Sequence, residues 1–133
     1  SLLLRWSALA TIADAGSVAI ALVAAHTAAR APLPSFMRLV PSARTDGLAA
    51  AAGAPSWESA AIAWVLGATA LLVGLGFVGA VAGLLLLVLA TAAIARLSVR
   101  QIGGQTGDVV GALEQVNEVL ILLTAAVVLN PQT

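Results

Sequence analysis

The stretch AAIAWVLGATALLVGLGFVGAVAGLLLLVLATAAIA, residues 60–95, contains no charged side chain and decides the fold. As one α-helix it would be about 54 Å long, whereas the hydrocarbon core of a membrane is about 30 Å thick. We therefore predict that this stretch crosses a membrane twice. Glycine adopts the backbone conformations that turns need, so the break is expected at Gly74, Gly76 and Gly79.

Two further apolar regions flank this stretch. The first covers residues 2–29 and is interrupted only by Arg5, Asp14 and His26. The second ends at Asn130. A helix of about 20 apolar residues spans a membrane, so the sequence predicts an all-α, polytopic membrane helical bundle with about four transmembrane helices. The expected spans are residues 2–29, 58–76, 78–96 and 108–129.

The composition agrees with a membrane protein. Hydrophobic residues make up 61% of the chain and charged residues 9%, which is outside the usual range of soluble domains. The chain has no cysteine, which excludes disulfides, thiolate metal sites and a cysteine nucleophile. The net charge is zero, so we expect no nucleic-acid partner.

The arginines predict the orientation of the bundle. With two spans in the middle stretch, five of the six arginines fall on one side of the membrane and only Arg5 lies toward the other. The positive-inside rule then makes the segments 30–57 and 97–107 cytoplasmic. The five arginines on that side are Arg30, Arg38, Arg44, Arg96 and Arg100.

A glycine-rich loop, RQIGGQTGD at residues 100–108, precedes the last span. Glycines allow backbone amides to point into one concavity, and the N-terminus of the next helix adds unpaired amides and partial positive charge. Such a loop suits a phosphate group, with Arg96 and Arg100 as countercharges. The alternative is a tight turn in which Asp108 or Thr106 only caps the helix.

Polar residues continue into the last span and share one face of it. Glu118 lies about 15 Å deeper than Asp108, where a carboxylate needs a partner or water. One interpretation is a polar cleft that faces Gly111 and opens to the cytoplasm. The other is a buried pair with an arginine or with Asp14. The residues on this face are Asp108, Gly111, Glu114, Gln115 and Glu118.

Asp14 and Arg5 cannot pair with each other on one helix, because they lie about 180° apart around its axis. Each therefore needs a partner elsewhere. His26 is the one histidine of the chain, and a lone histidine is more often structural than catalytic.

These residues resemble the C-terminal signature of cobalamin synthase, the adenosylcobinamide-GDP ribazoletransferase family. The resemblance is carried by RQIGGQTGDVVGA at residues 100–112 and EVLILL at residues 118–123. Further upstream, residues 3–6, 25–30, 37–38 and 43–48 are similar to the preceding part of that family.

The resemblance implies a transferase of cobalamin biosynthesis in the bacterial plasma (inner) membrane. Such an enzyme joins α-ribazole or its 5′-phosphate to adenosylcobinamide-GDP and releases GMP, and Mg²⁺ is implied as its cofactor. The substrate-binding positions that it implies are Arg100, Gly103, Gly104, Thr106, Gly107 and Asp108, with Arg30, Arg44 and Glu118 behind them.

The family also has an aspartate-rich motif in its N-terminal half, and nothing in this chain matches it. Asp46 and Gly47 echo that motif but lack its further aspartates. We therefore expect the chain to be about the C-terminal half of the enzyme, to be inactive alone and to need the N-terminal half. The catalytic base and the metal ligands are not assigned.

Two other classes of function compete with this interpretation. A transporter or channel fragment would use Asp14, Glu114 and Glu118 as ion or proton sites within the membrane. A structural subunit would use the polar groups only for helix packing. A transporter needs a polar path past Glu118, but the last span is almost wholly apolar beyond Leu120.

Overall fold

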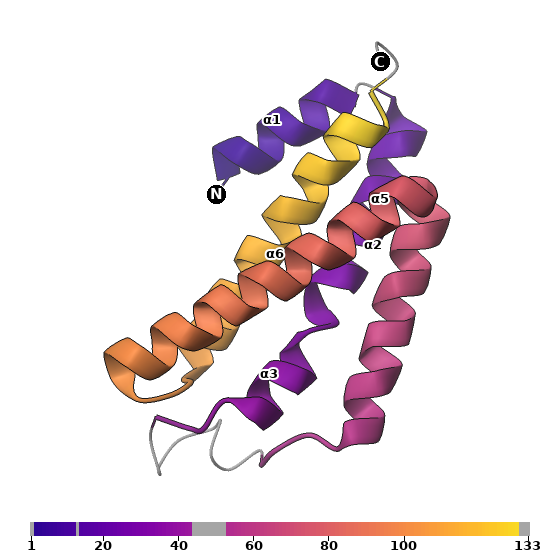
Figure 1. Ribbon diagram of the computed structural model, residues 1–133. Coiled ribbons are helices and arrows are strands. Elements are labelled where there is room, and N and C mark those ends of the chain that lie inside the picture. Colours follow the sequence, from indigo (N-terminus) through magenta and orange to yellow (C-terminus); the bar gives the residue numbers. More distant parts are fainter. Residues whose placement is uncertain (1, 13, 44–52, 131–133) are drawn as a thin grey trace.

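The computed structural model describes residues 2–12, 14–43 and 53–130 of the chain. Within these residues the structure is helical and has no strand beyond a bridge between Ser42 and Gln105 (Figure 1). This confirms the predicted all-α class. The helices are α1 (Leu2–Ile12), α2 (Ala15–Arg30), α3 (Leu33–Leu39), α5 (Trp57–Ile102) and α6 (Gly107–Val128).

Helix α5 reverses direction at Gly76. The backbone there has φ 69° and ψ −177°, a conformation that is essentially restricted to glycine. Residues 57–75 and 77–102 therefore form two arms, and both outer ends of α5 lie toward the lower part of the view in Figure 1. The predicted break in the charge-free stretch is confirmed.

The first apolar region differs from its prediction. Residues 2–29 were expected as one span, but the chain forms α1 and α2 as separate helices. Asp14 is the N-cap of α2, with extended backbone, and its Oδ2 accepts a hydrogen bond of 2.8 Å from the amide of Ser17. A side chain that caps the next helix competes with continuation of the previous one, which accounts for the break. The hydrogen bond from the Ser17 amide also lowers the pKa of Asp14.

Among the described residues, three helical segments are long and apolar enough to cross a membrane. Because α5 is bent at Gly76, its segment supplies two membrane-length arms. Large apolar side chains such as Val73 and Phe77 are exposed on these arms, as expected for surfaces that contact lipid. The protein is a multi-pass membrane protein. The three segments are Ala15–Leu39, Trp57–Ile102 and Gly107–Val128.

The core is built around the alanine-rich face of α2, which packs against both α5 and α6. Small side chains let helix backbones approach closely, which is a common way for membrane helices to associate. Larger side chains from α5 and α6 fill the remaining space. The buried residues of this core include Ala21, Ala25, Ala28, Leu71, Leu87, Ile121 and Leu122.

The bend at Gly76 is directly testable by substitution. We expect Gly76→Ala to lower the free energy of unfolding by about 1–3 kcal/mol, because a Cβ strains this backbone conformation. Gly111→Ala is the matched control, since a Cβ at Gly111 would meet no atom within 4 Å. Thermal unfolding of the purified protein in detergent measures both. Equal stability of the two variants would contradict the account of the bend.

Candidate functional site

The glycine-rich loop is formed by the end of α5 and the start of α6. Gly103 is the C-cap of α5 with φ 78°, and its amide donates to the carbonyl of Val99 at 3.1 Å. Thr106 is the N-cap of α6, and its hydroxyl accepts a hydrogen bond of 3.4 Å from the amide of Val109. Of the two residues expected as caps of α6, Thr106 is the cap, while Asp108 is exposed in the first turn.

The loop is hydrogen-bonded to residues 41–43, the segment that follows α3. The amide of Gln105 donates to the carbonyl of Pro41 at 2.8 Å, and the amide of Ala43 donates to the carbonyl of Gln105 at 2.9 Å. Gly104 lies so close to this segment that a Cβ on it would collide with the carbonyl oxygen of Pro41. The two segments that were predicted to be cytoplasmic thus contact each other.

Gln105 strengthens this contact with its side chain. Its Nε2 donates to the carbonyls of Met37 at 3.0 Å and Val40 at 3.3 Å, so it holds the C-terminal end of α3 against the loop. Gln105 was not among the predicted site residues. A glutamine in a glycine-rich loop has no local pattern that indicates such a role, because its partners are more than 60 residues away.

The predicted site residues of the loop lie together at this end of the bundle. Arg100 occupies the last turn of α5, Gly103 and Gly104 form the turn, and Gly107 and Asp108 begin α6. Arg100 is exposed and forms no ion pair with any described residue. Arg44 follows Ala43 in the sequence but lies outside the described residues. The arrangement provides an arginine and a helix N-terminus beside a tight backbone turn, which suits a phosphate.

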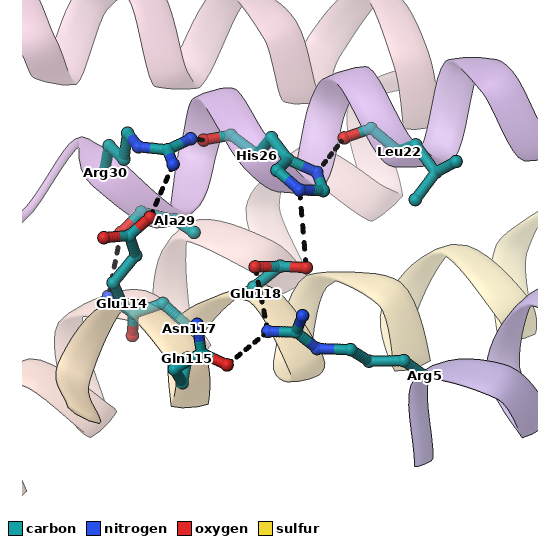
Figure 2. Close-up of polar contacts among 9 residues, drawn as sticks. All are labelled: Arg5, Leu22, His26, Ala29, Arg30, Glu114, Gln115, Asn117 and Glu118. Carbon is teal, nitrogen blue, oxygen red and sulfur yellow. Dashed lines mark hydrogen bonds and ion pairs between the residues drawn. The ribbon is translucent and has the colours of Figure 1, made fainter. Parts of the chain in front are cut away.

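A second polar group lies deeper, where α1, α2 and α6 meet (Figure 2). Glu118 of α6 is only 5% exposed. Its Oε2 binds the guanidinium of Arg5 at 2.9 Å, and its Oε1 lies 3.6 Å from Nε2 of His26. Arg5 also donates to Oε1 of Gln115 at 2.7 Å. The partner of Glu118 is therefore an arginine, as one alternative expected, and not Asp14.

Two further contacts join α2 to α6 in the same region. Arg30 pairs with Glu114 at 2.6 Å and also donates to the carbonyl of His26 at 3.0 Å. The buried Asn117 donates to the carbonyl of Ala29 at 3.2 Å. Figure 2 shows these side chains along the facing surfaces of α2 and α6. The predicted site residues thus fall into two groups, with Arg30 in the deeper one.

The two groups are separated along α6. Glu118 lies ten residues beyond Asp108, or about 15 Å along the helix axis. Its carboxylate is already engaged with Arg5. The structure does not bring Glu118 to the loop.

The described residues do not offer a magnesium site. A hard cation such as Mg²⁺ prefers carboxylate oxygens and water. Glu114 and Glu118 are each paired with an arginine, and Asp14 caps a helix. Within the described ranges, no three histidine, aspartate or glutamate side chains gather in one place.

Because Arg5 and Glu118 form a buried ion pair, we expect replacing Arg5 alone to lower the free energy of unfolding more than replacing both residues. Arg5→Met should lower the free energy of unfolding by about 3 kcal/mol or more, because it leaves the buried carboxylate without its arginine. The double variant Arg5→Met, Glu118→Met should recover most of this loss. Unfolding in mixed micelles measures the difference.

Arg38→Met is the matched control for this cycle. Arg38 is exposed, donates to the carbonyl of Pro55 and lies 4.6 Å from the centre of the Trp57 ring. Its loss should cost about 1 kcal/mol or less. If Arg5→Met is no less stable than Arg38→Met, the buried pair does not hold α1 to α6.

Comparison with known proteins extends over nearly the whole chain. Residues 1–126 match the family described as cobalamin-5-phosphate synthase. A relative from Bradyrhizobium diazoefficiens is 58% identical over 123 residues, which are 92% of this chain and 47% of the relative. One from Mesorhizobium japonicum is 53% identical over 130 residues, or 98% of this chain and 50% of the relative.

A more distant relative from Brucella ovis is 36% identical over 115 residues, which cover 84% of this chain and 44% of the relative. All three relatives are named adenosylcobinamide-GDP ribazoletransferase. The chain spans about half the length of these relatives. No solved structure matches it significantly. On the family match and these identities, the chain belongs to the cobalamin-5-phosphate synthase family.

Proposed function

We propose that this chain forms part of an adenosylcobinamide-GDP ribazoletransferase. The enzyme would join α-ribazole or its 5′-phosphate to adenosylcobinamide-GDP and release GMP. The observation that carries the proposal is the glycine-rich loop, with Arg100 before it and the N-terminus of α6 after it. The names of the relatives supply the substrates.

The loop has a role in this chemistry because the reaction takes place at a pyrophosphate. A hydroxyl oxygen of the ribazole gives up its proton to the catalytic base and forms a new bond to the phosphorus next to the cobinamide. The bond from that phosphorus to the bridging oxygen breaks, and GMP leaves with its electron pair. Negative charge shifts onto the phosphate oxygens, and preorganised donors stabilise it. Arg100 and the first amides of α6, at Gly107 and Asp108, are the donors that we assign to this task.

The remaining loop residues shape the site. Gly103 and Gly104 allow the turn and its close contact with residues 41–43, and Thr106 fixes the start of α6. The exposed carboxylate of Asp108 is a candidate acceptor for a substrate hydroxyl. Arg44 belongs to the same proposal by its place in the sequence, directly after Ala43.

Arg30 and Glu118 are also proposed to contact the substrate, but they differ from the loop residues because both are already paired. Each already binds a side chain of opposite charge, Arg30 with Glu114 and Glu118 with Arg5. A substrate group would have to displace or share those partners. We assign them to the deeper part of the site, behind the loop.

The catalytic base and the magnesium ligands are proposed to lie outside the described residues. Mg²⁺ would neutralise pyrophosphate charge when bound, but the described carboxylates do not assemble a site for it. The relatives are about twice as long as this chain, and we propose that their remaining half supplies these groups. The membrane is proposed to be the bacterial inner membrane.

The competing transporter function finds less support. An ion path would need polar groups on α6 beyond Glu118. The buried side chains that follow there are mainly apolar, and the hydroxyl of Thr124 donates to the carbonyl of Leu120 within the same helix. The polar face of α6 is therefore confined to the half of the helix that starts at the loop.

The loop assignment predicts losses of transferase activity. Arg100→Ala and Gly104→Ala should each lower kcat/KM for adenosylcobinamide-GDP on the order of 10²-fold. The first removes a phosphate donor and the second forces the loop away from Pro41. Asp108→Asn tests the exposed carboxylate. GMP release by membranes that contain the complete gene product, with Mg²⁺ and both substrates, measures all three.

Gly111→Ala is the control for these variants, because it adds the same methyl group to α6 in open space. It should keep activity within about twofold, and protein levels are checked by immunoblot. Normal activity of Arg100→Ala and Gly104→Ala would show that the loop is not part of the active site. Wild-type membranes that release no GMP would contradict the proposed reaction itself.

A further inference from the structure

An open groove lies at the loop end of the bundle, between α3 and the second arm of α5. Its volume is about 630 Å³. Four of its lining residues are apolar and two are arginines, and none of the lining residues is acidic. The lining residues are Leu39, Val40, Ala95, Arg96, Val99 and Arg100.

The two arginines of the groove are spaced to share one anion. Arg96 and Arg100 are four residues apart in α5, so they lie on the same face about 6 Å apart along the axis. Like charges at this spacing repel each other. Neither arginine forms an ion pair within the described part of the chain. An anionic group between them would relieve this repulsion.

The arginines lie at the depth of lipid headgroups. The uncharged part of the second arm, residues 77–95, is about 28 Å long, which matches the hydrocarbon core of a membrane. Arg96 is the first charged residue after it. Trp57, at the start of the other arm, is exposed and lies beneath the guanidinium of Arg38 at 4.6 Å. Tryptophan is enriched at membrane–water interfaces, so it independently marks this end as interfacial.

The apolar side chains of the groove are exposed, and a soluble anion bound to the arginines would leave them exposed. Leu39 is 67% exposed and Val99 44% exposed beside the arginines. A fatty acyl chain would cover them while a phosphate reaches the two guanidinium groups. We propose that this groove binds one phospholipid with an anionic headgroup, its phosphate between Arg96 and Arg100 and an acyl chain along Leu39 and Val99. Arg100 is shared with the site that we assign to the pyrophosphate of the substrate, whereas Arg96, Leu39 and Val99 belong to the lipid site alone.

Lipid binding to the purified complete gene product in detergent tests this site. Native mass spectrometry gives the affinity for phosphatidylglycerol and for phosphatidylcholine. We expect phosphatidylglycerol to bind at least on the order of tenfold tighter, since each arginine near a headgroup adds about 1 kcal/mol. The double variant Arg96→Gln, Arg100→Gln should lose this preference. Arg38→Gln removes a charge at the same end, outside the groove, and should keep it.

Glycerol 3-phosphate distinguishes a lipid from a soluble phosphate. Wild-type protein that binds it as tightly as phosphatidylglycerol has a soluble-phosphate site, which would overturn the proposal. An equal loss of lipid preference in the Arg38→Gln variant would show only general charge attraction and would also overturn it. Phosphatidylglycerol, phosphatidylcholine and glycerol 3-phosphate are compared on wild-type protein, so this part of the test does not depend on whether a variant folds. Because GMP release is not measured, failure of the proposed transferase function leaves this test intact.

Discussion

The reversal of α5 at Gly76 places both ends of that helix at one end of the bundle. A straight helix of that length would put residues 57 and 102 about 67 Å apart, on opposite sides of a membrane. The reversal instead lets the segment after α3 reach the loop before α6, where the two segments bond through Pro41, Ala43 and Gln105. The candidate phosphate site depends on that meeting.

A second constraint is that a charged side chain inside the bundle needs a partner of opposite charge. Glu118 is paired with Arg5 and Glu114 with Arg30, and Nε2 of His26 lies 3.6 Å from the carboxylate of Glu118. These contacts fix α1 and α2 against one face of α6. By contrast, Arg96 and Arg100 lie outside the apolar core and have no ion pair among the described residues, which leaves them available for anions.

Hydrophobicity and charge alone predicted much of the fold. The charge-free stretch predicted two arms and a glycine break, because length and lipid thickness leave no other solution. The division between α1 and α2 was missed, since Asp14 was interpreted as a charge within a span when it is a helix cap. In the site, Thr106 was one of two candidate caps recognised from their local position, and the structure selects it. Gln105 was not recognised, and an arginine was one expected partner of Glu118 but was not identified as Arg5, because both contacts join distant parts of the chain.

The contact between the loop and the segment after α3 can be measured by a disulfide. The chain has no native cysteine, so Ser42→Cys, Gln105→Cys would introduce one pair. Paired extended segments lie about 4.8 Å apart, and a disulfide needs Cα atoms about 4.4–6.8 Å apart. The account predicts that this pair forms an intramolecular disulfide in membranes on mild oxidation, detected by peptide mass spectrometry, while Ser42→Cys, Gly111→Cys does not. Failure of the first pair to cross-link would contradict the meeting of the two segments on which the site is built.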